Sequence, residues 1–147
     1  MTLIYYNALF SLELCSEKAH FFNGSCYQHM GDAMYTNSEA KQKCIDSNAG
    51  SIMALESDVE DSYIKYRLGG NNQTVWNNFE NLGNGWSFPG SNSQYRNWLQ
   101  DEPKAGNNAS VIVYEKDGVN PMVYGWRSVV MGSSFKAQLI CEQMNVV

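Results

Sequence analysis

The chain has 147 residues, a length that supports one domain with its own hydrophobic core. Aromatic residues make up 13% of it, and 10 Lys and Arg against 15 Asp and Glu give a formal net charge of -5. So many aromatic residues exclude a mainly disordered chain, and the acidic balance argues against a nucleic-acid partner, which would require a basic stripe. No stretch of the sequence reaches the ~18 consecutive apolar residues of a membrane-spanning helix.

The first segment, residues 1–14, is apolar but is not a clear secretory signal. Asn7 and Glu13 interrupt it, and no Lys or Arg precedes its apolar run, whereas a signal peptide begins with basic residues and ends in a cleavage site of small ones. We predict an N-terminal extension or first strand here, with a signal remnant as the alternative. Residues 15–147 are predicted to form the single domain.

Cysteine usage points to an oxidising compartment. Four cysteines occur, an even number, and none forms a C-x-x-C pair, so two disulfides are favoured over a redox site. A zinc site is the alternative reading, with two sulfurs and two imidazoles, although the spacing matches no common zinc finger. The cysteines are Cys15, Cys26, Cys44 and Cys141, and the zinc ligands would be Cys15, His20, Cys26 and His29.

Three N-x-S/T sequons agree with an extracellular chain. They begin at Asn23, Asn72 and Asn108, which are therefore candidate N-glycosylation sites. Together with the disulfides, they predict an extracellular or secreted glycoprotein.

The first elements in chain order are a hairpin and a helix. Asn23-Gly24 between two apolar pairs predicts a hairpin over 21–29. Thr36 and Glu39 form a capping box that opens a helix, and Gly50 is typical of its end.

A short buried strand over 51–55 and a second helix follow. A second capping box, from Ser57 to Glu60, opens this helix, and Gly69-Gly70 closes it. Its predicted apolar face consists of Val59, Tyr63, Ile64 and Leu68.

The character of the sequence changes after residue 70. No helical period is present between 71 and 125, and glycine, asparagine and tryptophan are dense. Short strands fit 74–76, 110–114, 124–127 and 135–142. Aromatic residues in such a region anchor a long loop to the body of the domain and leave its rim for binding. These anchors are Trp76, Trp86, Phe88, Trp98 and Trp126.

This order of elements resembles a C-type lectin-like domain over about residues 15–143. The matching fragments are Gly24-x-Cys26-Tyr27, Ala40-x-x-x-Cys44, residues 50–55, Val75-Trp76, residues 86–90, residues 95–98, Glu102-Pro103, Trp126 and Ile140-Cys141-Glu142. The resemblance implies an α+β fold, with two helices flanking a small antiparallel sheet and a long loop region. It also implies a Cys15–Cys26 disulfide, as in the long form of the family, and a Cys44–Cys141 disulfide.

The sequence departs from the family in its core. Ser110 and Met131 stand at the two positions of the usual second core disulfide, and Asn37 stands where the first helix usually has a Trp. These two residues cannot form a disulfide, so we expect the loop either to be held by packing or to be looser than in the family.

The calcium site of sugar-binding relatives is also altered. Those relatives use a Glu-Pro-Asn or Gln-Pro-Asp triplet, a nearby Glu and a Trp-Asn-Asp motif to hold calcium and vicinal sugar hydroxyls. Calcium requires about 6–8 oxygen ligands, yet Lys104 and Arg127 bring only positively charged donors. We predict no calcium and no other cofactor, a structural cis-proline turn at Glu102-Pro103, and an ion pair from Glu102 to Lys104 or Arg127. The candidate ligand-binding residues are Glu102, Lys104, Asn108, Trp126, Arg127 and Ser128.

No catalytic constellation is evident in the sequence, because both histidines lie near the N-terminus and every cysteine has an expected disulfide partner. We predict a non-enzymatic, extracellular recognition module that binds a protein or glycan without calcium through its long loop region. A calcium-dependent carbohydrate-binding lectin with a non-standard site is one alternative. The other is a structural or dimerising module, active as a homodimer.

Overall fold

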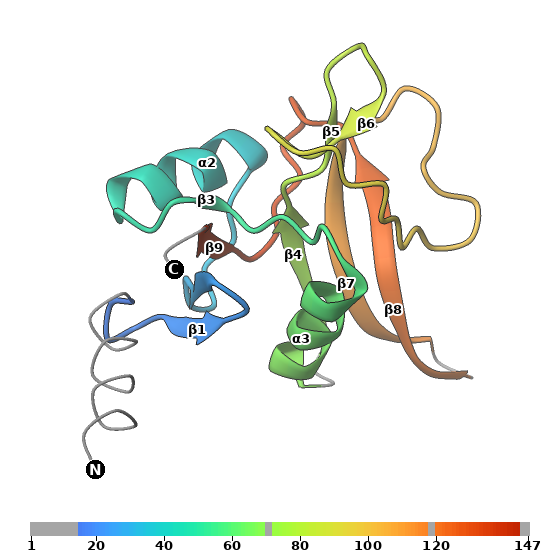
Figure 1. The fold of residues 1–147 in the computed structure, drawn as a ribbon. Helices are drawn as coiled ribbons and strands as arrows, with labels where there is room; N and C mark the ends of the chain where they lie inside the picture. Colours follow the sequence, from blue (N-terminus) through green and yellow to red (C-terminus); the bar gives the residue numbers. More distant parts are fainter. Residues whose placement is uncertain (1–14, 70–71, 118–119, 145–147) are drawn as a thin grey trace.

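The computed structural model describes residues 15–69, 72–117 and 120–144, so the expectations for residues 1–14 lie outside the described residues. A four-stranded antiparallel sheet brings the beginning and the end of the described chain together (Figure 1). Its order is β1 (His20–Phe22), β2 (Ser25–His29), β9 (Ile140–Gln143) and β3 (Ser51–Ile52). The predicted hairpin is confirmed: Asn23 and Gly24 both have positive φ, as the two-residue turn between β1 and β2 requires.

The first helix, α2 (Asn37–Asp46), has the predicted capping box. Glu39 N–H donates to Thr36 Oγ1, and Thr36 N–H donates to the Glu39 carboxylate. The helix ends four residues before Gly50, earlier than predicted, and the glycine has another role. A Cβ at Gly50 would lie 2.2 Å from the carbonyl oxygen of Glu142, so only glycine lets this segment approach β9.

The second helix, α3 (Asp58–Leu68), differs from its prediction in two ways. Ser57 caps it, but Glu60 does not return to the Ser57 backbone, and its carboxylate instead accepts a bond from the Tyr27 hydroxyl at 2.8 Å. Val59, expected in the apolar face, is 51% exposed, whereas Asp61 is buried. Ile64 and Leu68 are buried as predicted, and Gly69 ends the helix in the left-handed conformation.

A second, three-stranded antiparallel sheet carries the loop region. Its order is β4 (Gln73–Asn77), β7 (Ala109–Asp117) and β8 (Asn120–Val129). The short hairpin β5 (Glu80–Asn81) and β6 (Trp86–Ser87) projects beside it (Figure 1). The strands β4, β7 and β8 are each longer at both ends than the strands predicted from the sequence. Of the strand predicted over 135–142, only β9 is a regular strand, because residues 137 and 138 before it make isolated bridges.

The core forms two clusters on either side of β4 and β7. One, containing Trp76, packs under α2. The other is aromatic and joins the loop region to the body through Phe79, Phe88, Trp98 and Trp126. Ser110, which stands at one of the two positions of the family's second core disulfide, is fully buried, and its hydroxyl donates to the carbonyl oxygen of Phe79.

Both expected disulfides, Cys15–Cys26 and Cys44–Cys141, are formed, and no described cysteine is free. The zinc alternative is therefore wrong, because its two sulfurs are bonded to each other. The long bridge joins α2 to β9.

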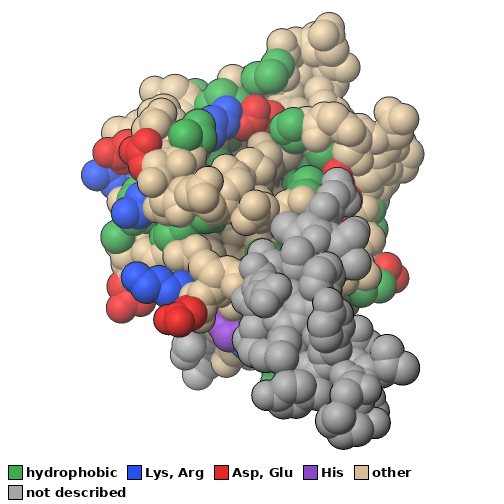
Figure 2. Space-filling model, turned by 60° about the vertical axis from the view of Figure 1, so that its left-hand side comes forward, with side chains coloured by type: hydrophobic (Ala, Val, Ile, Leu, Met, Phe, Trp, Pro, Cys, Tyr) green, Lys and Arg blue, Asp and Glu red, His purple; other side chains and the backbone are tan. Residues whose placement is uncertain are grey.

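The face shown in Figure 2 has no large patch of a single charge, because acidic and basic side chains lie next to one another on it. Among the residues that the structure describes, no helix has the length and apolarity needed to cross a membrane.

Candidate functional site

Glu102 and Ser128 form the centre of the altered calcium site. Glu102 lies in the loop between β6 and β7, after the sharp turn at Asp101 and before a cis bond to Pro103. One oxygen of its carboxylate accepts hydrogen bonds from Ser128 N–H at 2.9 Å and from Ser128 Oγ at 2.7 Å. Ser128 is only 4% exposed near the end of β8, so the carboxylate fastens the loop to the sheet.

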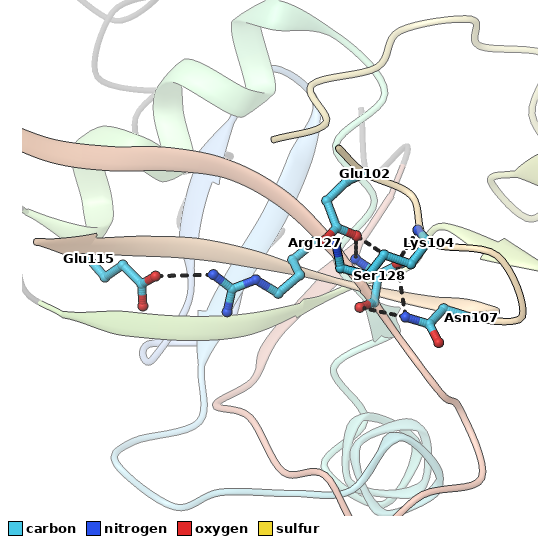
Figure 3. A network of polar contacts seen from close by, with 6 residues as sticks. All are labelled: Glu102, Lys104, Asn107, Glu115, Arg127 and Ser128. Atoms are coloured by element: carbon cyan, nitrogen blue, oxygen red, sulfur yellow. Dashed lines mark hydrogen bonds and ion pairs between the residues drawn. The ribbon is translucent and has the colours of Figure 1, made fainter. Parts of the chain in front are cut away.

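Two further loop residues complete this network (Figure 3). The ammonium of Lys104 lies 3.5 Å from the second oxygen of Glu102, which confirms one of the two predicted ion pairs. Ser128 Oγ also accepts bonds from the backbone N–H of Lys104 at 2.9 Å and from the side-chain amide of Asn107 at 3.1 Å. The hydroxyl thus donates once and accepts twice, and has no capacity left for a ligand.

The charge on Glu102 is stabilised by these contacts. Burial acts to raise the pKa of the carboxyl group, but the bonds from Ser128 and the charge of Lys104 outweigh it and hold the pKa below its usual value. The carboxylate is therefore ionised at neutral pH, and its contribution to stability is lost as the pH falls below the usual pKa of a Glu.

We expect Glu102→Gln to lower the free energy of unfolding by about 1–3 kcal/mol at pH 7, because hydrogen bonds to a charged group are lost. Urea unfolding at pH 7 and at pH 3.5 measures this, and the difference between the two proteins should shrink at the lower pH. Glu115→Gln, which removes an exposed carboxylate, is the matched control and should cost at most about 0.5 kcal/mol. Equal losses in both variants would contradict the role given to Glu102.

Arg127 does not join the network, which corrects the expectation that its charge occupies the calcium position. Its guanidinium lies 3.1 Å from Glu115 across the β7–β8 pair, and both side chains are more than 40% exposed (Figure 3). Alternation along β8 explains this, because Trp126 and Ser128 point to one face of the sheet and Arg127 to the other.

Two other predicted ligand-binding residues have structural roles. Trp126 is fully buried at the centre of the aromatic cluster. The side-chain oxygen of Asn108 accepts a hydrogen bond from Met131 N–H at 2.7 Å. Its backbone carbonyl accepts from Asn81 N–H, and its backbone N–H donates to the carbonyl of Val129. Trp126 therefore presents no surface to a ligand and Asn108 is half-buried, so Lys104, with 61% of its side chain exposed, is the most accessible of the candidates.

The donor set does not fit calcium. Glu102 supplies one carboxylate, and the neighbouring amide and hydroxyl groups of Asn107 and Ser128 are bonded to one another. An ammonium ion already lies beside the carboxylate, whereas calcium needs about 6–8 oxygen ligands. Within residues 15–69, 72–117 and 120–144, no group of three His, Cys, Asp or Glu is placed to hold a metal ion.

Asp61, which the sequence reasoning missed, holds the loop region in place. Its carboxylate is 2% exposed and accepts bonds from the Tyr95 hydroxyl and the Asn97 amide, both at 2.7 Å, and from the Tyr124 hydroxyl. Arg96 adds a second fastening, because its guanidinium donates to the carbonyl oxygen of Trp86 and lies 4.4 Å from the centre of the Phe79 ring. Three strong donors explain how an acid is accommodated in the core.

Known structures share the fold of this chain. SPL-2, a Ca²⁺-independent C-type lectin from Saxidomus purpuratus, aligns with a TM-score of 0.75 and 23% identity over 89% of this chain and 94% of its own. The C-type lectin domain of murine dendritic cell inhibitory receptor 2, solved with an N-glycan, aligns with a TM-score of 0.73 and 18% identity over 88% of this chain and 98% of its own. This chain folds as a C-type lectin-like domain.

Sequence comparison finds similarity to chondrolectin from two mammals. Chondrolectin of Homo sapiens is 30% identical to this C-type lectin-like domain over 129 residues, which cover 71% of the domain chain and 46% of chondrolectin. Mouse chondrolectin is 29% identical over 118 residues, 42% of its length, so the chain spans less than half of these relatives. No protein-family model matches the sequence.

Proposed function

We propose that this C-type lectin-like domain is an extracellular, non-enzymatic recognition module that binds a glycan or protein ligand without calcium through the rim of its loop region. The ion pair between Lys104 and Glu102 carries the proposal, because a protein cation lies beside the carboxylate that the family resemblance implies as a calcium ligand in sugar-binding relatives. The ammonium supports the loop through Glu102, as a calcium ion would, and remains exposed. Its N–H groups are donors for hydroxyl or carboxylate oxygens of a ligand.

The relatives support the same reading. SPL-2 is described as Ca²⁺-independent, and structures of SPL-1 with GlcNAc and of dendritic cell inhibitory receptor 2 with an N-glycan have the same fold. The two disulfides are typical of extracellular domains. Asn23 and Asn72 are exposed and are the sequons that suit glycosylation, whereas the half-buried amide of Asn108 is bonded to Met131.

Glycan-array binding with calcium and with a chelator tests this function. We expect the same bound glycans in both conditions, and calorimetry with millimolar calcium should give no saturable heat. Lys104→Ala should weaken ligand binding, while Lys43→Ala, on the far helix α2, should not.

Saturable calcium binding with a dissociation constant below about 1 mM, the weak end for extracellular modules, would instead establish the calcium-dependent lectin. If Lys104→Ala leaves glycan binding unchanged, the ligand binds elsewhere than at this rim, and the proposed site is wrong.

A further inference from the structure

A small cavity lies away from the loop region, between the β1–β2 hairpin, helix α3 and strand β9. Its volume is about 100 Å³. Four of its lining residues are buried and form an apolar floor: Tyr27, Ile64, Leu68 and Ile140. In Figure 1, α3 and β1 lie in the lower half of the view, while β8, which carries Ser128 near its end, ends near the top.

The rim of the cavity carries nitrogen donors and no carboxylate. His20, His29 and Arg67 are exposed and line it. Arg67 forms no ion pair with any acidic group among the described residues, and Asp32, which shares an adjoining hollow with it, lies beyond ion-pair distance. His29 accepts a bond from Gly31 N–H at Nδ1, so its other ring nitrogen carries the proton that is available for donation.

One wall of the cavity is fixed in advance. Tyr63 stacks flat on Phe22, with ring centroids 4.0 Å apart and an interplanar angle of 2°. Burial raises the pKa of Tyr63, and the charge of Arg67, which lines the same cavity, opposes that shift. The Tyr27 hydroxyl is bonded to Glu60, so the floor offers no spare polar group. A preformed apolar floor lowers the entropic cost of binding.

We propose that this cavity binds a small organic carboxylate whose apolar body, a phenyl ring or a branched alkyl group, rests on the floor while its charge meets Arg67 at the rim. The size is suitable, since an apolar cavity of about 150 Å³ accepts benzene, and this smaller one is open at the rim. The charge is suitable because a guanidinium pairs with a carboxylate in a bidentate geometry. The site is separate from the proposed lectin site and does not depend on it.

Phenylacetate is the probe, followed by the backbone amide shifts of the whole chain in NMR titrations. A ligand of about ten non-hydrogen atoms should bind with a dissociation constant on the order of 1 mM. We expect saturable shifts confined to the elements that line the cavity, which are β1, β2, α3 and β9. Neutral phenylacetamide should bind about tenfold more weakly, because it lacks the charged partner for Arg67. Acetate should give no saturable shift, because it lacks the apolar body.

Arg67→Gln should weaken phenylacetate about tenfold and leave phenylacetamide unchanged. Lys65→Gln is the control on the same helix, because Lys65 lies over the Tyr124 ring, 5.5 Å from its centroid, and does not line the cavity. Equal affinities for acid and amide, equal effects of the two variants, or no saturable shift with phenylacetate would overturn the proposal. None of these outcomes bears on the test of Lys104.

Discussion

Removing the Cys44–Cys141 disulfide with a Cys44→Ala, Cys141→Ala variant is expected to lower the free energy of unfolding by about 4–5 kcal/mol. The bridge closes a separation of 97 residues, and the loop-closure entropy that it removes from the unfolded chain grows with that length. Such a loss is a large part of the ~5–15 kcal/mol by which domains of this kind are stable. Urea unfolding without reductant measures it.

The second disulfide provides the comparison. Cys15–Cys26 closes a separation of 11 residues, for which the same relation gives about 3 kcal/mol. The double alanine variant at these positions should therefore be the more stable of the two by about 2 kcal/mol. Equal losses would show that native contacts around each bridge, rather than the length of the loop, determine its contribution.

Local signals in the sequence were sufficient for several elements of the fold. Asn23-Gly24 specifies its turn because both residues accept positive φ, and the Thr36 and Glu39 box specifies the start of α2 because both partners lie within one turn. The four cysteines with the ordered fragments around them indicated the domain family and both disulfides. Each of these signals is carried by residues that act through their own backbone or covalent chemistry.

The environment of α3 could not be predicted in the same way. Counting apolar residues placed Val59 inside and gave no reason to bury Asp61, yet in the structure Val59 is exposed and Asp61 is buried. Asp61 is buried because donors from Tyr95, Asn97 and Tyr124, between 34 and 63 positions away, converge on it. No local pattern encodes such a meeting.

The candidate site was predicted in part. The sequence indicated that Lys104 or Arg127 neutralises Glu102, but the choice depends on which face of β8 each side chain takes. Side chains alternate between the two faces of a strand, so the burial of Trp126 on one face would have assigned Arg127 to the other. On that face Arg127 pairs with Glu115. Asn107 gave no signal, because its role arises only when the loop folds back on Ser128.

The domain is expected to be more stable at pH 5 than at pH 8, because of a buried acid in its last strand. Glu142 is 2% exposed in β9. Burial raises the pKa of its carboxyl group from 4.5 to about 7, and the charge of Glu60 adds to the shift, although bonds from Ala54 N–H and Ser25 Oγ oppose it. The folded protein therefore holds this proton more tightly than the unfolded chain does.

The sign and size of the effect follow from this shift. Stability from the protonated form is fully present below pH 4.5, the usual pKa, and is lost as the pH rises through about 7. The shift corresponds to about 3 kcal/mol in the free energy of unfolding. Burial also raises the pKa of Glu60 and acts in the same direction, whereas the lowered pKa of Glu102 acts only at lower pH.

Glu142→Gln tests the assignment, because the amide keeps the shape of the protonated acid. Its oxygen can accept from Ala54 N–H at the place where the carboxylate does so at 3.0 Å, and its NH₂ can donate to Ser25 Oγ. We expect the variant to be more stable than the native chain by about 2–3 kcal/mol at pH 8 and nearly equal to it at pH 5. Urea unfolding at pH steps from 5 to 8.5 gives both curves, with Glu17→Gln, an exposed carboxylate near the start of the described chain, as the control. A variant that is less stable at pH 8 would mean that Glu142 is needed there as an ion, and that its hydrogen bonds with Ala54 and Ser25 outweigh the cost of burying its charge.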